Sequence, residues 1–149
     1  MLISASSPNF ESLSLRLRTS GFAQLVELYE PFDEVFIGSW NGTSNSCSIN
    51  QVISIETRLQ QAVSVSMDLS EVQMADLLVS QQWLRMIVWQ LCTQLGYLSS
   101  TAKHESLTFW YPIIIARDLM ISTWDISEYS MQIHGIGLVS TWFPSLLSS

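Results

Sequence analysis

The feature that most constrains the fold of this 149-residue chain is a run from residue 71 to residue 95 without proline or glycine. Ser70 and Gln73, just at its start, have the spacing of a capping box, in which two side chains satisfy free backbone amides at the beginning of a helix. Gly96 follows the run, as glycine commonly does after a helix. The pattern therefore predicts one long helix that ends at about Leu95.

Apolar side chains recur along this run every three or four positions, which is the spacing of one helix face. Their surface is broad and indicates a central, mostly buried helix. We expect Gln82 and Arg85 on its narrow solvent-facing side. The apolar positions are Leu84, Ile87, Val88, Leu91 and Leu95, widened by Trp83, Met86, Trp89 and Cys92.

Shorter segments before the long helix show the same periodicity. They predict helices over residues 10–17, 22–29 and 49–64, the second of which ends at Glu30 because the residue before Pro31 avoids the helical region. Residues 38–48 are rich in glycine, asparagine and serine and are typical of a linker.

Two further helices are predicted after the long one. Pro112 suits the first residue of a helix, with Ile115 and Leu119 facing inward and Ile113 and Ala116 as further inward candidates. Asp125 and Glu128 have capping-box spacing and predict a short helix that ends near His134 and Gly135. Residues 34–37 and 113–115 resemble strands but are too short and isolated to build a sheet.

These segments predict an all-α fold, an irregular helical bundle. We divide the chain into an N-terminal helical segment (1–37), a linker (38–48) and a helical region (49–149). No stretch has the 18 to 20 apolar residues of a membrane span, and the N-terminus lacks the basic start of a signal peptide.

The charge pattern argues against nucleic acid and membrane surfaces as partners of the chain by itself. The formal net charge is −7, and the six basic residues are scattered, whereas phosphate binding needs clustered cations. Cys47 and Cys92 lack zinc-ligand spacing to each other or to a histidine, so we expect no metal or cofactor. Cys92 is expected in the core and Cys47 as a free loop thiol, in a reducing compartment.

Several polar residues could carry chemistry but have simpler explanations. The acidic neighbours Glu27, Glu30, Asp33 and Glu34 could form an acid–base pair or bind a cation, yet charges near a helix end are usually solvated. His104 is expected to be exposed in a polar loop. His134 could be a general base, but its position before Gly135 favours capping or packing. We therefore assign no catalytic residue.

Tryptophan and one central ion pair complete the candidates. The six tryptophans, at positions 40, 83, 89, 110, 124 and 142, could line a ligand pocket but more commonly pack in a core or an interface. Trp83 and Trp89 are six positions apart and should diverge around their helix. Arg117 and Asp118 lie within an apolar helix, which favours an ion pair in the core or between subunits.

Four ordered blocks between residues 80 and 138 resemble the regulatory regions of fungal zinc-cluster (Zn2Cys6) transcription factors. The first is Trp-Leu-Arg followed by Val-Trp-Gln (83–85 and 88–90), and the second is Leu-Ser-Ser (98–100). The third is Phe-x-Tyr-Pro-x-x-Ile-Ala-Arg-Asp-Leu (109–119), and the last is Ser-x-x-x-His-Gly-x-Gly (130–137). Together they cover about 60 residues.

The resemblance implies part of a larger helical regulatory domain, a nuclear protein that regulates transcription, often of a secondary-metabolite gene cluster. The six-cysteine DNA-binding module of that family is not present in this sequence, so no zinc or DNA contact can be carried over. After Gly137 the helical continuation expected of the family is replaced by a polar end, as in a truncated protein.

Two functions from different classes follow. The first is a regulator without its own DNA-binding module, not an enzyme, that contacts a protein partner or a second copy through the apolar helix 80–95. The alternative is a small cofactorless biosynthetic enzyme or ligand-binding helper with a tryptophan-lined pocket, for which a buried pair such as Asp118 with His134 would be the mark.

Overall fold

The computed structural model describes residues 20–43, 46–63 and 69–130, and every regular element in these ranges is helical. Residues 20–29 are helical and lead into α2 (Glu34–Asn41), α3 (Ile49–Ala62) and the long α4 (Glu71–Gln94). A short 3₁₀ helix, η1 (Glu105–Leu107), precedes α5 (Tyr111–Ser122), and residues 128–130 are again helical. The predicted all-α fold class is confirmed.

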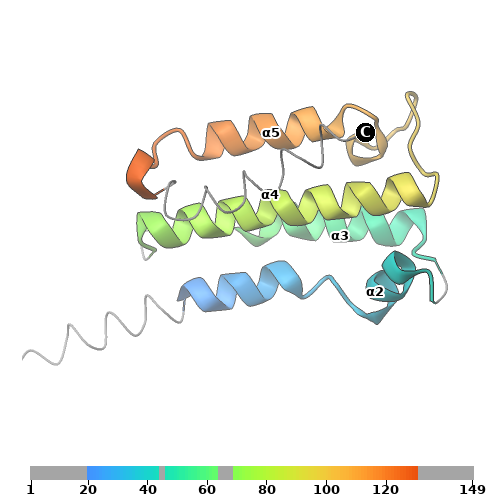
Figure 1. The fold of residues 1–149 in the computed structure, drawn as a ribbon, viewed down its shortest axis with the longest axis horizontal. Helices are drawn as coiled ribbons and strands as arrows, with labels where there is room; N and C mark the ends of the chain where they lie inside the picture. Colours follow the sequence, from blue (N-terminus) through green and yellow to red (C-terminus); the bar gives the residue numbers. More distant parts are fainter. Residues whose placement is uncertain (1–19, 44–45, 64–68, 131–149) are drawn as a thin grey trace, which may run out of the picture.

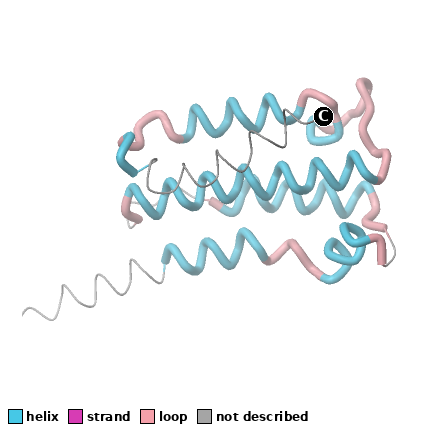
Figure 2. The backbone as a smooth tube through the Cα atoms, in the orientation of Figure 1, coloured by secondary structure: helices cyan, strands magenta, loops and turns pink. Residues whose placement is uncertain are grey.

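Helix α4 is the central element of the structure, because it contacts both α3 and α5 (Figure 1). Figure 2 shows the helices linked by loops, with the 20–29 helix on the opposite side of α4 from α5. The main core joins α4 to the elements that precede it, through buried residues such as Leu28, Val52, Leu59, Leu84 and Leu91. A smaller cluster of Met86, Tyr111 and Ile115 joins α4 to α5.

The predicted ends of α4 are confirmed. Ser70 accepts a hydrogen bond from the backbone amide of Gln73, whose side chain accepts one from the amide of Ser70, as a capping box requires. Gly96 has φ of +72°, a left-handed conformation that glycine adopts without a steric penalty. Helix α3 begins with the same device, formed by Ser48 and Gln51, which sequence analysis did not identify.

Part of the predicted linker is folded. Residues 38–41 form the second half of α2, and residues 34–37, which resemble a strand in sequence, form its first half. Asp33 caps the helix by accepting from the amide of Phe36 at 2.9 Å, and Gly42 ends it with φ of +66°. Buried Ser39 accepts from the amide of Cys47 at 2.6 Å, which holds the following loop against the helix.

The predictions for α5 and the next turn were partly right. Pro112 is the second helical residue rather than the first, and Ile115 is buried as expected. Ile113 and Ala116 are exposed, because they lie outside the face of α5 that Tyr111 and Ile115 bury against α4. The turn at 128–130 is capped by Ser127, whose hydroxyl accepts from the amide of Ser130, and not by Asp125. The predicted helix at 10–17 lies outside the described residues.

Candidate functional site

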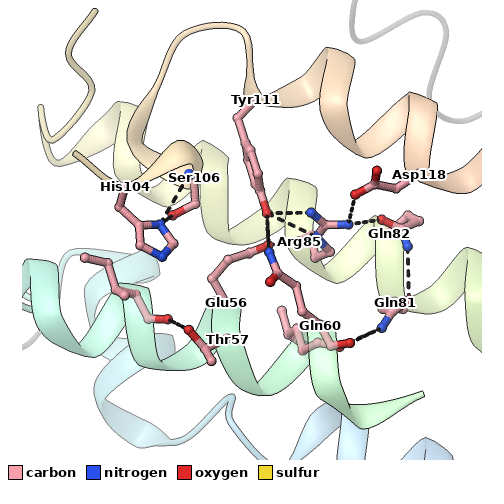
Figure 3. A network of polar contacts seen from close by, with 12 residues as sticks. Glu56, Thr57, Gln60, Gln81, Gln82, Arg85, His104, Ser106, Tyr111 and Asp118 are labelled. Carbon is pink, nitrogen blue, oxygen red and sulfur yellow. Dashed lines mark hydrogen bonds and ion pairs between the residues drawn. The ribbon is translucent and has the colours of Figure 1, made fainter. Parts of the chain in front are cut away.

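The most highly connected polar group in the described part of the chain is the guanidinium of Arg85, in the middle of α4 (Figure 3). Its Nε donates to Glu56 Oε1 at 2.7 Å, and its Nη1 donates to Gln82 Oε1 at 2.6 Å and to Asp118 Oδ2 at 3.0 Å. Both Nε and Nη2 also donate to the Tyr111 hydroxyl, at 3.1 and 2.7 Å. The site therefore joins α3, α4 and α5.

The expectation that Gln82 and Arg85 face solvent was wrong. Arg85 is only 4% exposed and Gln82 is equally buried. Helical periodicity places them on the less apolar side of α4, but Glu56 and Tyr111 from the neighbouring helices cover that side and supply polar partners. A buried charge is tolerated when it is paired and hydrogen-bonded in this way.

Each partner reaches Arg85 from a position fixed by its own helix. Glu56 stands in α3 between Val52 and Leu59, which are buried on the same face, and is itself fully buried. Tyr111 and Asp118 are seven positions apart in α5 and therefore lie on one face, two turns from each other. The Tyr111 hydroxyl donates to Glu56 Oε1, which closes a triangle between the three helices.

The charges of the network explain its protonation. Burial alone lowers the pKa of Arg85, but the interactions with Tyr111 and Glu56 outweigh it and hold the pKa above its ordinary value. Burial, followed by the charge of Glu56, raises the pKa of Tyr111. The guanidinium also lies over the Tyr111 ring, with Cζ 5.2 Å from the ring centroid. Arg85 is thus held as a cation and Tyr111 as a neutral phenol.

Three glutamines extend the network toward a solvent-facing pocket. Gln82 donates to Gln81 Oε1 at 3.0 Å, and Gln81 donates to the Leu59 carbonyl at 2.7 Å, which ties α4 to the backbone of α3. Gln60 donates weakly to Glu56 and to Tyr111. The pocket beside them has a volume of about 380 Å³ and is lined by Gln60, Gln81, Gln82, Arg85, Glu105, Asp118, Ile121 and Ser122.

The arrangement is best suited to holding helices in register. Arg85 donates hydrogen bonds to four side chains from three helices. Movement of any one helix would therefore leave charged groups buried without their partners. Within this network, Glu56 Oε2 is the one side-chain oxygen or nitrogen that is buried and has no hydrogen-bond partner among the described residues. The network thus fixes where α3 and α5 sit on α4.

Sequence analysis identified Asp118 but missed Glu56, Gln60 and Tyr111. It predicted an ion pair of Arg117 and Asp118 in the core or between subunits. The structure has this pair at 3.0 Å, but Arg117 is 61% exposed, so the pair is not in the core. Asp118 also pairs with the buried Arg85 at 3.0 Å. Glu56 did carry a signal, since it occupies one of the i, i+3, i+4, i+7 positions that Val52, Ile55 and Leu59 mark as a buried face. A carboxylate at such a position calls for a buried cation.

The other predicted acidic residues are dispersed. Glu30 forms an exposed ion pair with Arg58, and Asp33 caps α2. Glu27 and Glu34 are exposed. No group of three or more His, Cys, Asp or Glu residues in the described ranges could hold a metal ion.

The histidine and cysteine predictions had mixed outcomes. His104 is half-buried rather than exposed, because its Nδ1 lies 2.7 Å from the Ser106 hydroxyl at the start of η1. His134 and the suggested Asp118–His134 pair lie outside the described residues. Both cysteines are free and buried, so Cys92 is in the core as predicted, and Cys47 is a loop residue that packs inside. Burial, then the charge of Glu56, raises the pKa of Cys92 to about 12.

The tryptophans do not gather around one pocket in the described structure. Trp83 packs against the main core and Trp89 against the smaller one, so the two diverge as predicted. The Trp89 indole donates to the Thr108 carbonyl at 3.0 Å. Trp124 is 83% exposed, and Trp142 lies outside the described residues.

The apolar surface of helix 80–95, which we expected to contact a partner, is covered by other helices of the same chain. Its large apolar residues are buried or partly buried against the two core clusters. The exposed large apolar residues of the described structure lie elsewhere: on the 20–29 helix, on α2, at the start of α3, on the outer side of α5 and in the segments just before and after α5.

Comparison of the chain with family models, with curated proteins and with solved structures found no match. None of the described helices is both long enough and apolar enough to cross a membrane.

Proposed function

We propose that the chain is the effector region of a fungal zinc-cluster-like transcription regulator, and that this region acts in the nucleus through protein contacts rather than by binding DNA itself. The resemblance of residues 80–138 to such regulators suggests control of a secondary-metabolite gene cluster. In this proposal the protein is not an enzyme.

One observation carries the proposal. The separate sequence blocks on which the resemblance rests supply Arg85, Tyr111 and Asp118, and these three side chains are joined by hydrogen bonds around one buried guanidinium. The shared residues are therefore the ones that position α4 and α5. A resemblance that is concentrated in interlocking residues is what a common helical scaffold would produce.

The charge distribution supports the part of the proposal in which this chain does not itself bind DNA. The chain carries a net charge of −7, and of its basic residues Arg85 is enclosed by Glu56 and Asp118. Phosphate contacts need exposed and clustered cations.

The test is to fuse the chain to an unrelated DNA-binding domain and to measure a reporter gene in fungal cells. We expect the fusion to change reporter transcription, and we expect Arg85→Met, which loosens the scaffold, to abolish the effect. The matched control is Ser122→Ala, an exposed position at the end of α5. A folded, nuclear fusion that leaves the reporter unchanged would contradict the proposal, as would tight, salt-sensitive DNA binding by the purified chain.

A second candidate, a ligand-binding helper, is favoured by the pocket of about 380 Å³ beside Arg85 and Asp118. Its lining is mainly polar, with Gln60, Gln81 and Gln82, so the ligand would be a small polar molecule rather than the aromatic compound that a tryptophan-lined pocket would take. Thermal unfolding in the presence of small amides and amines tests it, since a ligand specific to the folded chain raises the unfolding temperature.

A further inference from the structure

The pocket of about 380 Å³ beside Arg85, called here the glutamine pocket, connects buried polar side chains with the solvent. Its lining comes from α3, α4, α5 and η1, and its volume is in the range of small-molecule sites. Gln81, Gln82 and Arg85 form its floor, since none of them is more than 6% exposed. A ligand in such a pocket is selected by the hydrogen bonds that the floor still offers.

Two N–H donors on the floor of the glutamine pocket have no partner among the described residues. Gln82 Nε2 donates one hydrogen to Gln81 Oε1, and its second hydrogen is unused. The contacts of Arg85 occupy the Nε hydrogen, both Nη1 hydrogens and one of the two Nη2 hydrogens, so the second Nη2 hydrogen is also unused. Arg85 is 4% exposed and Gln82 is 3% exposed. A ligand atom that accepts these hydrogens would therefore satisfy donors that water reaches poorly.

The rim of the glutamine pocket supplies an acceptor. Gln60 Nε2 donates to Glu56 Oε1 at 3.4 Å and to the Tyr111 hydroxyl at 3.3 Å (Figure 3). Because an ionised carboxylate can only accept, the Gln60 amide must turn its nitrogen toward Glu56, and its Oε1 has no partner among the described residues. The pocket thus combines unused donors at its floor with an unused acceptor at its exposed rim.

The charges around the glutamine pocket disfavour ionic ligands. The Arg85 cation is already paired with Glu56 and Asp118, and the exposed Glu105 also lines the pocket. An anion would therefore meet carboxylates whose charge is not offset by a free cation. An ammonium group would meet the unused hydrogens of Gln82 and Arg85 and has no acceptor to offer them. A neutral group that both accepts and donates hydrogen bonds avoids both conflicts.

We propose that the glutamine pocket binds a small molecule that carries a primary carboxamide. The carbonyl oxygen of the ligand accepts from Gln82 and Arg85, and its amide nitrogen donates to Gln60 Oε1. Ile121, an exposed apolar residue in the pocket wall, contacts the hydrocarbon part of the ligand. This inference goes beyond the transcriptional role and rests on the second candidate function, because it names the class of ligand that such a helper would bind.

Three probes of nearly equal size and different head group test the class of ligand: isovaleramide, isovalerate and isoamylamine. Each is titrated into the full chain while NMR follows the side-chain amide signals of the glutamines. Isovaleramide should shift the signals of Gln82 and Gln60 saturably, with a Kd on the order of 1–10 mM for a ligand this small. Isovalerate and isoamylamine should bind about tenfold more weakly, because each leaves buried hydrogens or charges unpaired.

Two variants locate the binding in the glutamine pocket. Gln60→Leu should weaken the binding of isovaleramide about two- to tenfold, the effect of one neutral hydrogen bond. Its matched control is Gln61→Leu, because Gln61 is the next residue of α3, is exposed and lines a different pocket. Gln82→Glu keeps an acceptor for Arg85 but removes the floor donor, and should abolish the binding. Circular dichroism verifies folding, and the exposed Gln60 position provides the test should Gln82→Glu not fold.

The outcomes separate this inference from the proposed functions. Tighter binding of isovalerate or isoamylamine at Gln82 would overturn the carboxamide class and leave the second candidate function in place. The absence of a saturable shift with isovaleramide would overturn the inference, as would equal losses in Gln60→Leu and Gln61→Leu. Failure of the second candidate function itself would appear as no stabilisation by any compound in thermal unfolding, and the reporter experiment tests the transcriptional role independently.

Discussion

Helices α4 and α5 pack against each other, and both carry apolar side chains around most of their circumference, yet they have different surroundings. Helix α4 has neighbours on several sides, and its apolar residues and Arg85 are buried. Helix α5 buries Tyr111 and Ile115 against α4 and leaves Ile113 and Met120 in solvent. The comparison teaches that composition and periodicity define a helix, whereas the number of its neighbours decides which of its faces are interior.

The first prediction concerns the buried charge of α4 and has the largest expected effect. Arg85→Met should lower the free energy of unfolding by about 3–5 kcal/mol, because it leaves Glu56 buried without its cation. Urea unfolding followed by circular dichroism measures the loss. The double variant Arg85→Met with Glu56→Leu should recover most of the stability, since two apolar side chains need no pairing. A single variant as stable as the unaltered chain would mean that Arg85 is not enclosed.

The second prediction compares apolar truncations on the two helices. Leu91→Ala in α4 should cost about 2–5 kcal/mol, because it opens a cavity in the main core. Ile113→Ala on the outer side of α5 should change stability by no more than about 0.5 kcal/mol. Both values come from urea unfolding at low protein concentration. Equal losses would show that α5 is as enclosed as α4.

The third prediction uses Tyr111, through which the inner face of α5 joins the network. Tyr111→Phe should cost about 1–3 kcal/mol at neutral pH, because Arg85 and Glu56 lose a hydrogen-bond partner. The raised pKa of Tyr111 in the folded chain has a further consequence at alkaline pH. Unfolding lets the phenol ionise at its ordinary pKa of about 10, so its contribution to stability is present below pH ~10 and is lost as the pH rises further.

Ultraviolet absorbance of tyrosinate tests that alkaline behaviour. Tyr111→Phe should remove a step at high pH from the absorbance titration and reduce the loss of stability above pH ~10. Ionisation of Tyr111 at its ordinary pKa in the folded chain would contradict its buried position.

The smallest predicted effect is at the start of α4. Ser70→Ala should cost about 1 kcal/mol, because it removes the side chain that accepts from the Gln73 amide. Ser122→Ala, at the exposed end of α5, is the matched control and should be nearly neutral. Thermal unfolding of the two variants compares them directly. An equally small effect of both would mean that the capping box contributes little to α4.

Much of the fold was predictable because local signals mark helix ends. The Ser70–Gln73 box and Gly96 gave both ends of α4, since these signals act within a few residues. Helix α2 was missed because Gly38 and Ser39 are typical of loops, although Asp33 and Gly42 mark its two ends. Ser39 is buried in the helix and accepts from the Cys47 amide eight positions later, a contact that leaves no periodic trace in the sequence.

The site was less predictable for the same physical reason. Periodicity placed Arg85 on the correct side of α4 but could not show that α3 and α5 cover that side. The pairing of Arg85 with Glu56 spans 29 positions and that with Asp118 spans 33. A buried ion pair is visible in sequence only as two charges on apolar faces, and Glu56 was such a charge.

The measurement that tests the difference between α4 and α5 most directly is the rate of methionine oxidation by peroxide. Met86 in α4 is 8% exposed, and Met120 in α5 is 66% exposed, so the same chemistry reports on both helices. Peptide mass spectrometry of the dilute, monomeric chain should find sulfoxide at Met120 long before Met86. Equal rates at the two methionines in the folded chain would contradict the account of α4 as an interior helix and α5 as a helix with one open face.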